Sequence, residues 1–197
     1  MIRNHFKVIA TIAWLLSSHA NAQNSDSGPD TQFYTHTIFS VKNSAVMSAE
    51  GIQVVIDSVA AEAGGSVYAI WNPVVLADDA PFNGLVENDF IAMLSFDSDS
   101  TSVRDRVDSL FEKNTRIAES VTKLYYPVDI RVSGTVSTPT GFYVHRDEHY
   151  PIGAMNTAVS LSQRAWTTWE DYWQVKVVGL FRRVDDEQGV AKLNRIV

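Results

Sequence analysis

The feature that most constrains this chain is a tryptophan-rich segment followed directly by a β-branched one. Val159, Trp166, Trp169 and Trp173 recur at spacings that place them on one stripe of an α-helix. The next residues, Gln174–Arg183, are rich in valine and predict a strand. A helix with so many aromatic residues needs a sheet to cover, so the pattern predicts a helix packed on a sheet. The stripe itself is expected to serve the core and a dimer contact, although exposed tryptophans could instead stack on sugars or cations.

The N-terminus has the pattern of a cleavable signal peptide over residues 1–22. Arg3 and Lys7 precede the apolar run Val8–Leu16, and Ala20-Asn21-Ala22 matches the small-x-small pattern of signal peptidase. The run is shorter than the roughly 20 residues that a spanning helix needs. We therefore expect cleavage after Ala22, a periplasmic or secreted protein without a membrane span, and a polar, disordered lead-in over residues 23–32.

Charge and cysteine content narrow the range of partners. The 197-residue chain has a formal charge of −7, and loss of Arg3 and Lys7 with the signal would make it −9. An acidic surface repels phosphate backbones, so we expect no nucleic-acid partner. The absence of cysteine excludes disulfides. We expect a single domain over residues 33–184, held together by its core, and a C-terminal tail over residues 185–197.

The expected elements alternate between strand and helix. The sequence predicts strands at 33–41, 66–71, 89–96 and 124–132, and helices from Ser48 to Ala63 and from about residue 103 to Ser120. Val74–Asn88 is expected to be a long loop, and Gly141–Arg146 could pair back on residues 124–132 as a hairpin. This order predicts an α+β fold: a ferredoxin-like antiparallel sheet with helices packed on one face, extended by a C-terminal β-α-β unit.

The first six elements resemble, in order and length, the dimeric α/β barrel superfamily, which includes antibiotic-biosynthesis monooxygenases and NIPSNAP-like proteins. The resemblance covers about half of the chain and is one of element pattern. It implies a pocket between sheet and helices, and a barrel closed by two sheets. Because the second half has too few elements for a tandem copy, we expect a homodimer.

Histidine 36 is the candidate catalytic residue. It lies on the same side of the first strand as Tyr34 and Ile38, and its ordinary pKa is near neutrality. On a pocket-facing side it could act as a general base or donate to a ligand carbonyl. The alternative is a structural histidine at the edge of the sheet.

Four further side chains are candidates for ligand contact: Tyr34, Trp71, Tyr143 and His145. Trp71 ends a strand beside the expected long loop, and Tyr143 could line the same opening. The i, i+4 spacing of His145 and His149 suits a metal pair on a helix. Here it falls between a strand-like run and Pro151, so we predict a polar turn, no metal and no cofactor.

No nucleophile elbow, phosphate-binding glycine loop or HExxH motif is present. The leading hypothesis is an exported protein that binds a small hydrophobic or aromatic molecule. The family resemblance implies a cofactor-independent oxygenase or isomerase. The alternative is a non-catalytic interaction module of the cell envelope with an aromatic surface.

Overall fold

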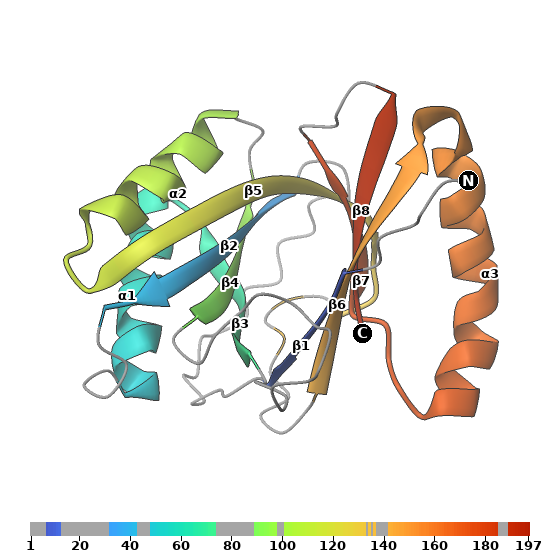
Figure 1. Ribbon diagram of the computed structural model, residues 1–197, viewed down its shortest axis with the longest axis horizontal. Helices are drawn as coiled ribbons and strands as arrows, with labels where there is room; N and C mark the ends of the chain where they lie inside the picture. The colour runs from blue at the N-terminus through green and yellow to red at the C-terminus, as the bar shows by residue number, and fades with distance from the viewer. Residues whose placement is uncertain are drawn as a thin grey trace.

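The computed structural model describes residues 7–12, 32–42, 48–73, 89–97, 101–132, 134, 136, 142–184 and 189–197. The lead-in over residues 23–31, the loop at 74–88 and the rest of the expected signal peptide lie outside the described residues. Within the described chain the fold is mixed α+β, with three α-helices around a curled antiparallel sheet (Figure 1).

The first half follows the expected alternation of elements. It contains β2 (Phe33–Val41), α1 (Ala49–Ala63), β3 (Ser66–Pro73), β4 (Asp89–Phe96), α2 (Thr101–Lys113) and β5 (Ile117–Ile130). These strands lie side by side in the order β3-β4-β2-β5, and every neighbouring pair is antiparallel.

The second half continues the same sheet. It contains β6 (Phe142–Pro151), the short 3-10 helix η2 (Ile152–Ala154), α3 (Met155–Trp173), β7 (Gly179–Arg183) and β8 (Val190–Ile196). The order continues β5-β7-β8-β6, so β5 pairs with β2 along one part of its length and with β7 along another. Residues 190–196, expected to be tail, therefore form a strand between two others. Residues 191–194 and Ile196 are all buried, as expected for a strand with neighbours on both edges and covered faces.

An N-terminal strand lies between the two ends of this sheet. β1 (Lys7–Ile12) pairs antiparallel with β6 on one side and with the end of β3 on the other, which closes the strands into a ring (Figure 1). This strand falls inside the segment expected to be a signal peptide. Because one chain completes the ring when β1 is present, closure does not require a second subunit.

The helices cover the outer face of the curled sheet (Figure 1). α1 and α2 bury Ile56, Val107 and Phe111 against the outward-facing Phe39 and Leu94 of the sheet. α3 packs Met155 and Trp166 on Leu180, Ala191 and Leu193 of β7 and β8. The opposite, concave face encloses a third cluster of side chains, which is rich in aromatic rings.

The helix α1 begins and ends where the sequence predicted, because each end has its own capping residue. The Ser48 side chain accepts from the Gly51 N–H, which caps the helix, and Gly64 ends it with φ of 78°. A left-handed residue at this place satisfies the last carbonyls, and glycine adopts it without steric cost.

The second helix is shorter than expected. α2 ends at Lys113, and residues 117–120 belong to β5. Asn114 makes the turn: its side chain accepts from the Arg116 N–H and its carbonyl accepts from the Ile117 N–H. Ile117 and Val121 fit a helical spacing by coincidence, because a turn of three residues separates them from the helix.

Two other expectations about strands are wrong. Residues 145–149, expected to be a polar turn, belong to the strand β6, which pairs with β1 and β8. Residues 124–132 and 141–146, for which a hairpin was one possible arrangement, thus contribute to strands in separate places of the described sheet. The predicted strand from Gln174 also begins late, at Gly179. Gln174 adopts φ of 53° at the end of α3, and the chain needs residues 175–178 to return to the sheet.

The tryptophan stripe is only partly buried. Trp166 is 3% exposed and Val159 and Trp169 pack against the outer cluster, whereas Trp173 is 61% exposed. The core interpretation is therefore correct for the middle of α3 and wrong for its last turn, which extends beyond the sheet.

Candidate functional site

The concave face of the sheet gathers the most unusual set of side chains in the described chain. The buried rings on this face come from five different strands: Tyr34, Tyr68, Trp71, Tyr125, Tyr143 and Phe181. Residues at i and i+2 of a strand share a face. Tyr68 and Trp71 are three residues apart on β3, and they share this face because the register shifts between Val67 and Ala69. The helix-covered face holds packed apolar core instead. The candidate residues thus lie on the concave side, not between sheet and helices as the family resemblance implies.

Four of the five residues singled out in the sequence meet at one point. His145 lies against Trp71, with ring centroids 4.5 Å apart and planes at 83°, and Trp71 lies 5.9 Å from Tyr143. His36 contacts His145 from the opposite strand. Tyr34 is buried on the same face but packs edge-on to Tyr68 and Phe181, each 5.1 Å away.

The two histidines form a direct pair. His36 Nε2 lies 3.3 Å from His145 Nδ1, and the two side chains are almost completely buried. The other nitrogen of each ring, His36 Nδ1 and His145 Nε2, has no hydrogen-bond partner among the described residues. Trp71 Nε1 is likewise unpartnered within the described chain. Buried polar atoms without partners are costly, so this cluster calls for an explanation.

Burial keeps both rings neutral. It lowers the pKa of His36 to about 4; Asp147 opposes this shift and Lys123 adds to it. The pKa of His145 falls well below 6.5, first through burial and then through repulsion from His36. At neutral pH the pair therefore shares one hydrogen bond between two uncharged imidazoles.

This arrangement leaves one free donor and one free acceptor whichever ring donates. If His36 Nε2 donates to His145, the Nδ1 of His36 is an acceptor and the Nε2 of His145 carries a proton. The opposite tautomer exchanges the two roles. A ligand with one polar group at each of these atoms could give up a proton to one nitrogen and receive one from the other. The pair can therefore support a proton shift without a metal or an oxidant.

Sequence reasoning missed the polar neighbours of the pair. Lys123 is the register partner of His36 on β5, and its Nζ lies 3.6 Å from Asp147 Oδ2. Asn194 donates to Asp147 Oδ1 at 2.8 Å. Burial would raise the pKa of Asp147, but Lys123 and Asn194 outweigh it and hold that pKa below its ordinary value. The alternation on β5 and β6 could have placed Lys123 and Asp147 on the concave face once the strand neighbours were known.

The concave-face tyrosines are held as neutral donors. Burial, with a contribution from Asp97, raises the pKa of Tyr34 to about 12, and its hydroxyl donates to Gln32 Oε1 at 2.9 Å. Burial also raises the pKa of Tyr68, which donates to the Val132 carbonyl at 2.9 Å. Because the Tyr34 and Tyr68 hydroxyls already donate to protein groups, they hold these rings in place. The histidine pair is then the polar part of this face that is open to a ligand.

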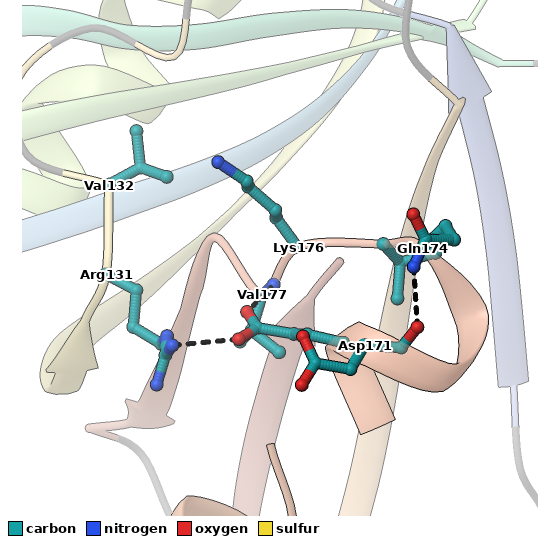
Figure 2. A pocket seen from close by; sticks show the side chains of 8 residues that line it. Arg131, Val132, Asp171, Gln174, Lys176 and Val177 are labelled. Carbon is teal, nitrogen blue, oxygen red and sulfur yellow. Dashed lines mark hydrogen bonds and ion pairs between the residues drawn. The ribbon is translucent and has the colours of Figure 1, made fainter. Parts of the chain in front are cut away.

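A surface hollow of about 480 Å³ lies between the end of β5 and the loop after α3 (Figure 2). Its charged groups are largely occupied with one another. Arg131 donates to Glu170 at 2.9 Å and lies over the Trp166 ring, and Glu170 also accepts from the Val177 N–H at 2.8 Å. These contacts join α3 to the sheet, and a structural role explains the hollow.

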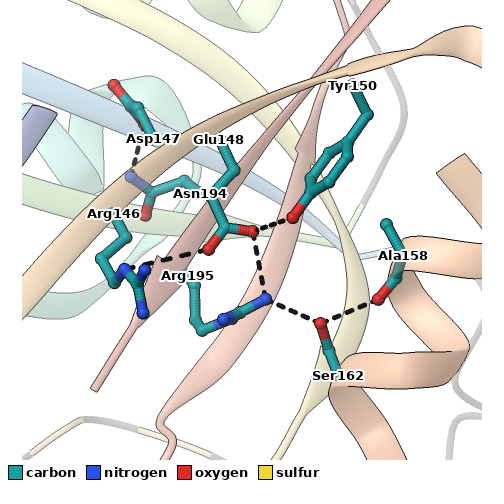
Figure 3. A network of polar contacts seen from close by, with 8 residues as sticks. All are labelled: Arg146, Asp147, Glu148, Tyr150, Ala158, Ser162, Asn194 and Arg195. Carbon is teal, nitrogen blue, oxygen red and sulfur yellow. Dashed lines mark hydrogen bonds and ion pairs between the residues drawn. The ribbon is translucent and has the colours of Figure 1, made fainter. Parts of the chain in front are cut away.

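A second polar network lies on the outer face, beneath α3 (Figure 3). Glu148, 4% exposed, accepts from Tyr150 at 2.6 Å and from Arg195 at 3.1 Å. Arg195 continues to Ser162 of α3 at 2.7 Å. Burial and Glu148 raise the pKa of Tyr150 to about 12, so it stays a donor. This network anchors α3, and its polar groups are paired with one another, except for Arg195 Nε, which has no partner among the described residues.

The described residues contain no group of three or more side chains suited to a metal ion. His145 and His149 both lie on β6, where His145 is buried and His149 is exposed. The burial of His145 is a further departure from the predicted polar turn. Among the described helices, none has the length and apolar character to cross a membrane.

Comparison with known proteins gives no assignment. No protein-family model matches the sequence, and no curated protein matches it either.

Proposed function

We propose that this is an exported protein that binds a small, planar hydrophobic or aromatic molecule on the concave face of its sheet. The observation that carries the proposal is the neutral His36–His145 pair, whose two outward nitrogens and the nearby Trp71 Nε1 lack partners in the described chain. Aromatic rings surround these atoms. Ligand sites commonly combine apolar walls with a few convergent polar groups.

The ligand that fits best carries a hydrogen-bond acceptor for one of these nitrogens and a donor or an acidic C–H for the other, as an enolisable carbonyl compound does. Of the two activities that the family resemblance implies, an isomerisation suits the pair better. One nitrogen removes a proton from carbon and the other returns one elsewhere, so atoms and electrons balance without further reactants. An oxygenase would need dioxygen as a second substrate.

We also infer that the chain is built from ferredoxin-like units of the dimeric α/β barrel type. The order β3-β4-β2-β5 is that of a ferredoxin-like sheet, and β7-β8-β6-β1 repeats its pattern, with β6-α3-β7 in the place of β2-α1-β3. The repeat supports the resemblance. A homodimer stays a prediction, since in the described chain β1 already closes the ring that a second subunit was expected to close.

The test is native mass spectrometry of protein purified from the periplasm, alone and as His145→Phe. This change keeps an aromatic ring and removes both nitrogens. We expect the unmodified protein to carry additional small-molecule mass, and His145→Phe to lose it while its melting temperature changes by only a few degrees. Phe142→Leu, at an exposed position on the same strand, is the control and should retain the mass.

Two results would contradict the proposal. One is retention of the bound mass by His145→Phe. The other is an unmodified protein that carries no extra mass and whose tryptophan fluorescence does not respond to a panel of planar aromatic carbonyl compounds.

A second candidate function, an envelope interaction module, has its own supporting observation. Tyr172 and Trp173 are 75% and 61% exposed and pack edge-on with centroids 5.0 Å apart at the end of α3. Exposed aromatic pairs are typical of interface anchors. Replacing both by serine should abolish capture of an envelope partner and leave small-molecule binding unchanged.

A further inference from the structure

The strand β1 occupies a place in the sheet that the exported chain would lose. Lys7–Ile12 pairs residue by residue with Asp147–Phe142 of β6, and Thr11 and Ile12 pair with Pro73 and Asn72 of β3. Cleavage after Ala22 would remove all of β1. The gap left between these parts of β3 and β6 is called the seam below.

The seam presents backbone groups that point outward. Val144 exchanges both of its backbone hydrogen bonds with Val197, at 2.9 and 3.1 Å, on the β8 side. Because the two sides alternate along an antiparallel strand, the N–H and C=O groups of Tyr143, His145 and Asp147 point to the seam. An unpaired strand edge is a template for another strand.

We propose that the seam of the processed protein accepts an extended segment of another exported polypeptide as an added strand. The proposal rests on the export proposed above. The segment runs antiparallel to β6 and, like Lys7–Ile12, is an uninterrupted β-prone stretch rich in apolar residues. Main-chain hydrogen bonds on both edges give affinity in this mode of recognition. A small molecule could not satisfy two strand edges, so the backbone geometry favours a polypeptide.

The added strand would lie directly over the candidate ligand site. Trp71 belongs to β3 and His145 to β6, the two strands that border the seam, and their rings meet at 4.5 Å. An occupied seam therefore closes the concave face on this side, and an empty one opens it.

Disulfide cross-linking tests the register, because the chain has no cysteine of its own. Phe142 is 74% exposed and pairs with Ile12. It belongs to the non-hydrogen-bonded set on this edge, where opposing Cα atoms lie about 4.5 Å apart, within disulfide range. Processed Phe142→Cys protein from the periplasm is mixed under oxidising conditions with a peptide of residues 5–14 that carries Ile12→Cys.

We expect cross-linking with the Ile12→Cys peptide and at least tenfold less with a Lys7→Cys peptide. Lys7 pairs with Asp147, about 17 Å along the strand. A third peptide with Ile9→Pro in addition to Ile12→Cys should also fail, because proline removes a ladder donor. Hydrogen exchange at residues 143–147 should slow when the matching peptide binds.

Four outcomes would overturn the proposal. The first is a periplasmic protein whose intact mass still includes residues 1–22. The second is equal cross-linking by the Ile12→Cys and Lys7→Cys peptides, and the third is none by either. The fourth is full protection of residues 143–147 without peptide in a dimeric protein, which would mean that a second copy fills the seam. None of these outcomes decides whether His145→Phe loses a bound ligand. The strand-addition proposal and the ligand-binding proposal can therefore be refuted independently.

Discussion

His36 and His145 lie 109 residues apart in the sequence and share one hydrogen bond in the fold. Their neutrality has a consequence for stability. Each ring has a folded-state pKa below its ordinary value of 6.5, so the unfolded chain binds protons first as the pH falls. Stability contributed by the pair is complete above pH 6.5 and is lost as the pH falls toward 4.

We therefore expect the free energy of unfolding to fall between pH 7.5 and pH 5. For His36 alone, the loss reached by pH 4 is at most on the order of 3 kcal/mol. Denaturant titrations at several pH values measure this. His145→Phe should flatten the dependence, whereas His149→Gln, at an exposed position, should not. A stability that stays constant or rises on acidification over this range would show that the pair is not buried and neutral.

Glu148 gives a second prediction for a single side chain. Glu148→Gln removes the charge that Arg195 and Tyr150 share, and it leaves a partly buried guanidinium without its counter-ion. We expect a loss of about 2 kcal/mol in the free energy of unfolding. The control is Glu119→Gln on the exposed surface, which should change it little. An equal effect in both variants would mean that the network under α3 contributes nothing.

Residue-level prediction succeeded where alternation alone decided the outcome. The side of β2 that holds His36, Tyr34 and Ile38 follows from a period of two, and the structure places Phe39 on the opposite side. His145 was different. The run His145–His149 is polar enough to suggest a surface turn, and only pairing with β8 and β1, both distant in sequence, explains why His145 is buried.

Among the elements, α1 shows how local chemistry fixes a boundary. Gly64→Ala would force a Cβ into a left-handed conformation at φ of 78°, although the space around it is open. We expect a loss of about 1 kcal/mol. Gly153→Ala, where φ is not positive and the space is also open, is the matched control and should be nearly neutral. Thermal unfolding of the two variants compares them, and equal melting temperatures would contradict the role of Gly64.

The elements that sequence reasoning misjudged are those whose ends depend on tertiary pairing. The first strands and α1 carry their own caps and period. The end of α2 at Lys113 depends on a turn at Asn114, and β7 begins only where Gly179 meets Ile130 and Ile196 in register. The ring of Phe181 packs so closely over Gly179 that a Cβ there would lie 2.8 Å from it. No local pattern shows such a constraint.

At the level of the whole molecule, the two ends of the chain differ in what they contribute. β8 supplies Leu193 to the outer cluster and Ile196 to the concave one, and it pairs with strands on both sides. β1 pairs along its length with β6 but meets β3 only at Asn72 and Pro73. We expect removal of residues 190–197 to abolish cooperative unfolding and removal of residues 1–22 to preserve it, as followed by circular dichroism. A folded protein without residues 190–197 would contradict the sheet order.

The overall α+β class and the helix-covered face could be predicted from element order. The joining of the two halves into one sheet could not, because it depends on β5 extending from β2 to β7 through Pro127. Proline usually marks a strand edge, and here the register shifts between Pro127 and Asp129. An irregularity in the ladder thus accommodates a residue that usually lies at an edge or at the start of a strand.

The position of β8 also determines when the protein can fold. Synthesis delivers residues in order, and β6 pairs with a strand that lies about forty residues further along the chain. Until Val190–Ile196 arrive, β6 and β7 have no strand between them and the concave cluster lacks one wall. Pairings of this range form slowly. Late completion of the sheet would suit the export proposed above, because a chain that completes its sheet late can still be unfolded when it reaches a secretion channel.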